Sequence, residues 1–582
     1  MKIERSKLVC VRCGNTDTPE RDVQQHFTLR NCFPLKSIRP PQENVLKELE
    51  NALNSKKFII LEAPVGFGKS AVAVALCKFL GSAHILTATK QLQDQYSSDF
   101  GFPIVKGKGN FQCYVRPPSG VLLPCSKGRC EVDWALKDCP HYMSFEEYEQ
   151  HAKRLCDRDA KCEHLKDKKL CTYYDQKWHG FRSPISVYNY SFLLSELKYA
   201  RDVPSRKLLV CDEGHELEKQ IVGFAAFQLK KSILQTYHGE LRPEENFVIP
   251  HKGLDDPAAW LDVLAKVGDL LSEYLDLHKE ADKMQDSVAM CKNLLDALES
   301  FMDSLKANSA NWVVNDVKMN SDLSVEEVTF QPLKVSDYTS QLFRIADRVL
   351  LMSATIFSEE RLYRSLGISS SEATIIKVQD STFPVDRRPI YALNTAYLNK
   401  ASMNSSLESI AQAVNRIMDR HDRERGVIHT TSYAQARYIV DHVSEQNRRR
   451  LITTEGSFDK STLIRIHGAS DASVLISPSL HLGVDLKDDL SRFQVIVKVP
   501  YPDLSERRTE MMLKRDRSWY DWQTAQRLVQ TYGRSVRSET DYAVTYVLDS
   551  NFTRFVDSNR NLFPNYFLEA LKVGNLPELK HP

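Results

Sequence analysis

The sequence predicts an α/β protein built from two lobes, each with a parallel sheet. A glycine-rich loop joins an apolar strand to an Ala/Val-rich helix over residues 58–76, and a second apolar strand, 207–211, ends in two carboxylates. Short apolar runs of this kind are typical of buried parallel strands. At 582 residues the chain is too long for one core, so we expect three or four domains. Further strands are expected at 349–352, 426–429, 474–476, 495–499 and 543–548.

The loop after the first strand has the residues that bind a triphosphate. Residues 63–70 read APVGFGKS and match the pattern AxxGxGK[ST], in which backbone N–H groups and a helix N-terminus surround the phosphates. We expect Lys69 to reach the β- and γ-phosphates and Ser70 to bind Mg²⁺. The other residues of the loop are Ala63, Pro64, Val65, Gly66, Phe67 and Gly68.

Two carboxylates follow the strand at 207–211, in the tetrapeptide Asp212-Glu213-Gly214-His215. The carboxyl end of a parallel strand opens onto the ligand crevice of an α/β sheet. There Asp212 would hold Mg²⁺, and Glu213 would orient or deprotonate the attacking water. Together with the phosphate loop, this pair predicts ATP hydrolysis.

Charge and hydropathy limit the partners. Lys plus Arg is 78 and Asp plus Glu is 76, a net charge of +2, so a nucleic-acid surface must be a local groove. No apolar run reaches transmembrane length, and the N-terminal residues lack the apolar core of a signal peptide. We expect a protein with no membrane partner, cytoplasmic in a prokaryote or nuclear in a eukaryote.

Cysteines are concentrated between the phosphate loop and the carboxylate pair. In an intracellular chain, thirteen cysteines indicate metal binding before disulfides, and thiolates suit an iron–sulfur cluster or zinc. Cys77, Cys211 and Cys291 lie in apolar or helical patterns and are expected to be buried core residues. The seven clustered cysteines are Cys113, Cys125, Cys130, Cys139, Cys156, Cys162 and Cys171.

Three further segments complete the pattern. Residues 257–332 contain one glycine and apolar residues at helical spacing, which predicts a helical insertion. Arg534 and Arg537 lie three apart, so on a helix they would share one face and point together at a phosphate chain. At the N-terminus, Cys10, Cys13, His26 and Cys32 form either a zinc site or a loose, reduced tail.

The motifs, taken in order, resemble those of a superfamily two helicase. The cysteine segment and the helical insertion place the resemblance with the iron–sulfur helicases of the XPD and DinG group. It covers about residues 35–560 and implies two RecA-like lobes, with the cysteine-rich and helical arch insertions in the first lobe. The matching segments are RPPQ, APVGFGKS, TATKQLQDQ, GKGNFQC, CTYYDQKW, SVYNYSFLL, DEGH, SAT, HTTS, GVDL and QTYGRSVR.

The resemblance implies roles for single residues. Gln42 would contact adenine, and His215 would couple the site to the second lobe. Ser353 and Thr355 would relay the nucleotide state to the nucleic acid. Gly214 stands where the family has alanine, and Leu482 stands where it has an acidic residue, in the segment that carries the nucleotide-site residues Gly483 and Asp485. Across the cleft, the site would be completed by Gln530, Arg534 and Arg537.

The resemblance also implies a 4Fe-4S cluster. The set we prefer as its ligands is Cys113, Cys156, Cys162 and Cys171, because the last three lead directly into the family's next segment. A rival set is Cys113, Cys125, Cys130 and Cys171, and a second metal stays open.

The family function implied is ATP-dependent unwinding of DNA with 5′ to 3′ polarity, by a monomer acting on single-stranded and forked DNA, with a role in repair. Alternatives are a translocase that remodels nucleoprotein and a helicase acting on RNA. Candidate strand contacts are Tyr173, Tyr174, Trp178, Tyr188 and Tyr190. The expected domains are a zinc extension (1–34), the first lobe (35–105, 181–218 and 343–365), the cluster domain (106–180), the arch (219–342) and the second lobe (366–582).

Overall fold

The structure is a computed structural model of the chain. Several residues with predicted roles lie outside its described part, namely Cys10, Cys13, His26, Cys130, Cys162, Gly483, Asp485, Arg537 and the side chain of Cys156. The described residues are 28–115, 124–127, 139–156, 170–199, 203–242, 249, 255–278, 285–320, 324–381, 383–398, 403–453, 460–478, 486, 488–536 and 540–574.

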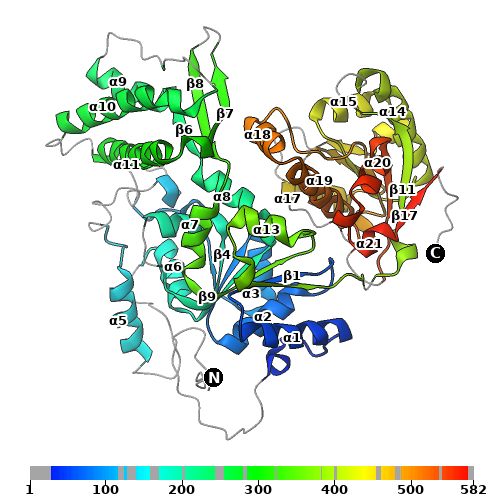
Figure 1. The fold of residues 1–582 in the computed structure, drawn as a ribbon, viewed down its shortest axis with the longest axis horizontal. Coiled ribbons are helices and arrows are strands. Elements are labelled where there is room, and N and C mark those ends of the chain that lie inside the picture. Colours follow the sequence, from blue (N-terminus) through cyan, green and yellow to red (C-terminus); the bar gives the residue numbers. More distant parts are fainter. Residues whose placement is uncertain are drawn as a thin grey trace, which may run out of the picture.

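The first lobe is a seven-stranded parallel sheet in the order β10-β1-β9-β5-β2-β4-β3 (Figure 1). Its central strands are buried along their whole length, as expected for a sheet covered by helices on both faces. The strands are β1 (Phe58–Glu62), β2 (Ala83–Thr87), β3 (Ile104–Val105), β4 (Ile185–Asn189), β5 (Arg206–Asp212), β9 (Ala346–Ser353) and β10 (Ala373–Lys377). The helices are α1 (Pro40–Leu53), α2 (Lys69–Leu80), α3 (Lys90–Phe100), α7 (Tyr190–Tyr199), α8 (Leu217–Ala225), α12 (Ser336–Phe343) and α13 (Glu359–Leu366).

The first lobe extends further along the chain than we predicted. We placed its end at residue 365, but β10 pairs with β1 in register from Phe58 opposite Ala373 to Glu62 opposite Lys377. The boundary prediction was therefore wrong. The cause is that β10 is short and follows a helix of the first lobe, so the sequence alone does not assign it to either sheet.

The second lobe is also a seven-stranded parallel sheet, in the order β13-β14-β12-β15-β16-β11-β17. Figure 1 shows it beside the first lobe, with α19 on the side that faces the first lobe. Its strands are β11 (Ile390–Ala396), β12 (Gly426–His429), β13 (Leu451–Thr453), β14 (Val474–Ser477), β15 (Phe493–Ile496), β16 (Val544–Asp549) and β17 (Leu571–Val573). Its helices are α14 (Met403–Arg420), α15 (Tyr433–His442), α16 (Glu445–Arg448), α17 (Lys460–Ala469), α18 (Arg507–Arg515), α19 (Arg517–Tyr532), α20 (Asn551–Ser558) and α21 (Asn565–Leu568).

The arch insertion contains a sheet as well as the predicted helices. Helices α9 (Lys231–Leu241), α10 (Leu261–Leu277) and α11 (Gln285–Ala307) pack on an antiparallel sheet in the order β6-β8-β7 (Figure 1). Its strands are β6 (Phe227–Lys230), β7 (Trp312–Met319) and β8 (Val325–Pro332). The purely helical prediction for 257–332 was therefore wrong. From Val328 to Pro332 of β8, buried and half-buried positions alternate, the period typical of a strand that is covered on one face.

The cysteine-rich insertion joins the first lobe through α6 (Thr172–Arg182), which packs on β3 and β4, and through α5 (Phe145–Cys156). Trp178 of α6 donates its indole N–H to the carbonyl of Met143 at 2.7 Å. Phe145 contacts the rings of Trp178 and Phe181. The insertion therefore shares the core of the first lobe.

Across the described residues, every helix is too short or too polar to cross a bilayer.

Candidate ATP-hydrolysis site

The loop between β1 and α2 has the backbone shape of a phosphate-binding loop. Gly66 and Gly68 adopt positive φ angles of 77° and 89°, a region unfavourable for residues with a side chain. A Cβ on Gly66 would lie 2.1 Å from the Phe383 ring, and one on Gly68 would lie 2.6 Å from the Gln42 amide. Glycine is thus required at both positions by conformation and by space.

Two side chains hold the carbonyls of this loop through three hydrogen bonds. Arg39 donates to the carbonyls of Gly66 at 3.0 Å and Phe67 at 2.7 Å, and Gln42 donates to that of Phe67 at 2.7 Å. Gln42 also accepts from the backbone N–H of Arg39 and is only 1% exposed. In this structure Gln42 holds the loop through these hydrogen bonds, and its contact with adenine stays a prediction. No role was predicted for Arg39, although it is the first residue of the matching segment RPPQ.

Lys69 begins α2 at the end of the loop. Its ammonium group donates to the carbonyls of Ala63 at 2.9 Å and Pro64 at 3.2 Å. When a triphosphate is bound, its oxygens would compete with these two carbonyl oxygens for the ammonium group of Lys69. Lys69 is therefore placed to exchange loop carbonyls for a triphosphate.

Ser70 and Asp212, the two Mg²⁺ ligands predicted from the sequence, both contact the hydroxyl of the buried Tyr96. The hydroxyl of Tyr96 lies 2.9 Å from Oδ2 of Asp212 and also interacts with the side chain of Ser70. Burial and the neighbouring Glu213 carboxylate raise the pKa of Asp212 to about 7, against the lowering effects of Tyr96 and Lys69. A hydroxyl and a carboxylate are the oxygen donors that Mg²⁺ prefers, so Ser70 and Asp212 fit this ion.

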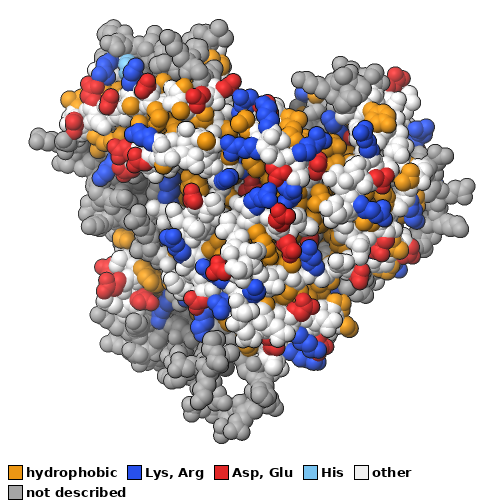
Figure 2. Space-filling view, viewed as in Figure 1, with side chains coloured by type: hydrophobic (Ala, Val, Ile, Leu, Met, Phe, Trp, Pro, Cys, Tyr) orange, Lys and Arg blue, Asp and Glu red, His pale blue; other side chains and the backbone are white. Residues whose placement is uncertain are grey.

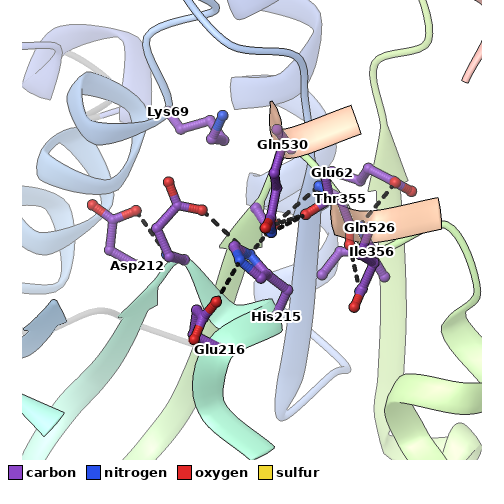
Figure 3. A network of polar contacts seen from close by, with 12 residues as sticks. Glu62, Lys69, Asp212, His215, Glu216, Thr355, Ile356, Gln526 and Gln530 are labelled. Carbon is purple, nitrogen blue, oxygen red and sulfur yellow. Dashed lines mark hydrogen bonds and ion pairs between the residues drawn. The ribbon is translucent and has the colours of Figure 1, made fainter. Parts of the chain in front are cut away.

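A chain of polar contacts runs from the carboxylate pair to the second lobe (Figure 3). Nδ1 of His215 lies 2.8 Å from the hydroxyl of Ser353, which lies 3.3 Å from that of Thr355. Gln530 of α19 donates to the Thr355 hydroxyl at 3.0 Å. His215 also lies 3.3 Å from Glu213. The structure therefore connects the residues for which a relay role was predicted.

A cleft of about 1090 Å³ separates the two lobes at this point. From the first lobe it is lined by Gly66, Glu213 and Thr355, and from the second by Gln530 and Arg534. A Cβ on Gly533 would lie 3.2 Å from Val65 of the phosphate loop, so the turn that carries Arg534 touches the loop. The prediction that Arg534 lies on a helix face was wrong, because α19 ends at Tyr532.

Four cysteines line a second, small pocket in the insertion: Cys113, Cys125, Cys139 and Cys171. Backbone hydrogen bonds join their segments, from Cys125 to the Phe111 carbonyl at 2.8 Å and from Cys171 to the His141 carbonyl at 2.9 Å. Cys113 and Cys171 of the preferred ligand set, and Cys125 of the rival set, line this pocket, and Cys139 belongs to neither set. The remaining predicted ligands, Cys130, Cys162 and the side chain of Cys156, lie outside the described residues, so both sets stay predictions. The two cysteine trios have nearly equal spacing, so spacing alone did not distinguish them.

The four thiols that line this pocket are the kind of donor that an iron–sulfur cluster would need. Within the described ranges, no three Cys, His, Asp or Glu side chains are close enough to hold one ion. Each thiolate of a 4Fe-4S cluster binds a different iron, so its four ligands surround a larger group. Cys113, Cys125 and Cys171 are each at most 8% exposed, as suits a protected cluster. The pocket is completed by Tyr114, Val115, His141 and Tyr174.

The aromatic residues predicted to contact a nucleic-acid strand are core residues. Tyr173, Tyr174, Trp178, Tyr188 and Tyr190 are all at most 5% exposed and belong to one hydrophobic cluster of the first lobe. That prediction was wrong. The predicted burial of Cys77, Cys211 and Cys291 is confirmed, since each is 0% exposed.

Comparisons with known proteins agree with this architecture. The DEAD_2 family matches residues 121–234, and the helicase C-terminal domain family matches residues 386–570. A probable ATP-dependent helicase of Methanocaldococcus jannaschii is 20% identical over 91% of this chain and 94% of its own length. An XPD helicase structure has a TM-score of 0.59 at 16% identity, covering 93% of this chain and all of its own. The S. tokodaii Xpd4 structure has a TM-score of 0.55 at 16% identity, covering 92% and all of its own chain.

Two parallel-sheet lobes, with a phosphate loop and a carboxylate pair facing the cleft between them, form the architecture of a two-lobed ATP-hydrolysing enzyme. More specifically, the two family matches and the relative, together with the fold, support an ATP-dependent helicase of superfamily two, of the XPD/DinG type.

Proposed function

We propose that this helicase acts on DNA, moving 5′ to 3′ along a single strand and separating the duplex at a fork, in a DNA-repair role. The observation that carries the proposal is the interlobe cleft, where Gly66 and Glu213 face Gln530 and Arg534. ATP in this cleft would contact both lobes, and hydrolysis would remove those contacts. The lobes would then open and close once per ATP.

Residues of both lobes would share the hydrolysis step. Lys69 would bind the β- and γ-phosphates, and Glu213 would orient the attacking water and take up its proton. Arg534, with Arg537, would approach the terminal phosphate from the second lobe and stabilise the charge that develops on it. Ser70 and Asp212 would hold Mg²⁺, which would neutralise phosphate charge when bound.

A basic surface between the arch and the second lobe supports a nucleic-acid partner. Figure 2 shows Lys and Arg side chains gathered on this face where α18 lies. Helix α18 and the start of α19 supply Arg507, Lys514, Arg515 and Arg517, against Glu510 and Asp516, whereas Arg508 is largely buried in an ion pair with Glu218. Local positive charge of this kind binds the phosphate backbone, in a chain whose net charge is only +2.

A 4Fe-4S cluster held by Cys113, Cys125, Cys139 and Cys171 is part of the proposal. When bound, it would cross-link four segments of the insertion and stiffen the part of the protein that would meet the fork. Unstacking one base-pair step costs about 1.4 kcal/mol, so a rigid wedge driven by one ATP per pair is energetically feasible.

The test is ATP hydrolysis and strand separation by the purified, cluster-loaded protein. We expect hydrolysis to be stimulated by single-stranded DNA, and a fork with a 5′ tail to be unwound in preference to one with a 3′ tail. Lys69→Ala and Glu213→Gln should abolish both activities. Stronger stimulation by single-stranded RNA would favour an RNA helicase, and hydrolysis without strand separation would favour a nucleoprotein-remodelling translocase.

A further inference from the structure

The backbone of residues 355–357, just after β9, is anchored to the base of the phosphate loop. Oε1 of Glu62 accepts hydrogen bonds from the backbone N–H groups of Ile356 at 3.1 Å and Phe357 at 2.7 Å. Glu62 is the last residue of β1, next to Ala63 of the loop, and is 9% exposed. One buried carboxylate oxygen therefore ties this segment to the phosphate loop.

The same segment, residues 355–357, also accepts hydrogen bonds from α19 of the second lobe (Figure 3). Trp522 donates its indole N–H to the Ile356 carbonyl at 2.6 Å, and Gln526 donates to the Thr355 carbonyl at 2.6 Å. With Gln530, these donors are spaced four residues apart on one face of α19. Trp522 and Gln526 are 1% and 3% exposed, so both bonds lie inside the interface.

The conformation of the segment needs support. Phe357 has a φ of 61°, in the left-handed region that residues with a side chain rarely adopt. Such a conformation persists when surrounding contacts hold it. The two N–H bonds to Glu62 and the indole bond from Trp522 fix the peptide groups on either side of Ile356. Without the carboxylate oxygen, two buried N–H groups would lose their acceptor.

The position of α19 against residues 355–357 determines where the second lobe approaches the phosphate loop. Helix α19 ends at Tyr532, and the next residue, Gly533, lies so near Val65 that an added Cβ would be 3.2 Å from the Val65 side chain. Arg534 follows immediately and lines the cleft. A shift of α19 on the segment at 355–357 would therefore move Arg534 relative to the triphosphate site.

We propose that Glu62 is a positioning residue that couples the phosphate loop to the second lobe, acting through residues 355–357 on Trp522 and Gln526. Its function is to set the position of Arg534 for ATP hydrolysis. The proposal rests on ATP hydrolysis between the lobes and is independent of the nucleic acid that stimulates it.

The test compares two variants of Glu62. Glu62→Gln keeps an oxygen in the place of Oε1, so its hydrolysis rate should stay close to that of the unsubstituted protein. Glu62→Leu removes the acceptor, and we expect kcat for ATP to fall about tenfold while KM for ATP changes little. Binding of a fluorescent ADP analogue, measured alongside, verifies that each variant retains a folded nucleotide site.

Trp522→Phe tests the other side of the coupling without disturbing β1. It keeps an aromatic ring but removes the donor to Ile356, so kcat should again fall with little change in KM. Trp519→Phe is the matched control, because it lies on the same helix and its indole N–H has no hydrogen-bond partner among the described residues. In the Glu62→Leu/Trp522→Phe double variant, the loss should be smaller than the product of the single losses.

Three results would overturn the proposal: an unchanged kcat in Glu62→Leu, an equal loss in Glu62→Gln, or single losses that multiply in the double variant. Rates are measured with single-stranded DNA and with single-stranded RNA. A preference for RNA would count against the proposed DNA substrate, whereas the ranking of the variants tests only the coupling.

Discussion

The hydroxyl of Tyr96 on α3 donates a 2.9 Å hydrogen bond to Oδ2 of Asp212 at the end of β5. Tyr96 is 1% exposed and Asp212 is 4% exposed, so water does not compete for this bond. Helix α3 begins within the segment TATKQLQDQ, which resembles a helicase motif outside the phosphate loop. Tyr96 therefore fixes the orientation of a carboxylate expected to bind Mg²⁺ from a helix that also lines the interlobe cleft.

Tyr96→Phe should weaken Mg²⁺ binding while leaving the fold intact. The phenyl ring can occupy the same space, but Asp212 loses a donor that orients it. A lost hydrogen bond to a charged group corresponds to about 1.5 kcal/mol, or roughly a tenfold higher Mg²⁺ concentration for half-maximal ATP hydrolysis. Magnesium titrations of the hydrolysis rate measure this shift, with Tyr438→Phe on α15 as the control. An unchanged magnesium requirement would contradict an orienting role for Tyr96.

The parts of the site that could be predicted from sequence are those encoded in contiguous residues. The residues 63–70 must form a phosphate loop because positive φ and close approach require Gly66 and Gly68. Asp212 and Glu213 were found because they directly follow an apolar run. The contacts of Tyr96, by contrast, join residues 116 positions apart, and no local pattern carries that information.

The errors share a physical origin. The helical prediction for 257–332 missed the strands β7 and β8, because their pairing with each other and with β6 is not visible in the periodicity of a single segment. Likewise, β10 belongs to the first sheet because of a pairing with β1 that bridges more than 300 residues. Trp178 and similar aromatics look the same in sequence whether they contact a ligand or fill a core. Their burial in the structure identifies them as core residues.

Cysteine substitutions should distinguish the pocket seen in the structure from the ligand set expected from sequence. We predict that Cys139→Ser loses the visible absorbance of the cluster in anaerobically prepared protein, because serine does not supply a thiolate for the fourth iron. Cys156→Ser should retain the absorbance. Iron content per chain, measured on the same preparations, provides an independent readout. Colour that survives in Cys139→Ser but disappears in Cys156→Ser would restore the original assignment.

Gly66→Ala should abolish nucleotide binding. A methyl group would be forced into the Phe383 ring, and alanine at a φ of 77° is strained in addition. Gly101→Ala is the control, since Gly101 has a similar φ of 73° but nothing within 4 Å of its added Cβ. Binding of a fluorescent ADP analogue should be lost in Gly66→Ala alone. Equal loss in both variants would show that backbone strain, and not the contact with Phe383, is responsible.

Buried His84 on β2 should make the first lobe sensitive to mild acid. Burial lowers the pKa of His84 to about 3, although its Nε2 lies 2.7 Å from the Pro204 carbonyl. Because the folded pKa lies below the unfolded value near 6.5, the stabilisation is present above that value. It is lost progressively as the pH falls from about 6.5 towards 3. Between pH 7 and 5.5 the loss should be about 1 kcal/mol.

Thermal unfolding of His84→Gln at these two pH values tests this assignment. The variant lacks the titrating ring, so its first unfolding transition should shift less between pH 7 and 5.5 than that of the unsubstituted protein. His442→Gln, at an exposed position of α15, controls for the substitution itself. An identical pH response in His84→Gln would assign the acid sensitivity to other groups.

Arg508 of α18 joins the second lobe to the helix that follows the carboxylate pair. Its guanidinium lies 2.7 Å from the Glu218 carboxylate and donates to the Pro332 carbonyl at 2.9 Å. The two side chains are only 11% and 10% exposed. Arg508→Ala would leave Glu218 buried without its partner, so we expect a loss of about 2 kcal/mol in the free energy of unfolding. Adding Glu218→Gln should recover part of this loss, because the uncompensated charge is removed.

The control is Lys514→Ala on the same helix, which breaks only an exposed pair with Glu510 and should cost less than about 1 kcal/mol. Chemical denaturation of the four proteins measures these differences, and equal losses in Arg508→Ala and Lys514→Ala would mean that the Arg508–Glu218 pair does not hold the lobes together.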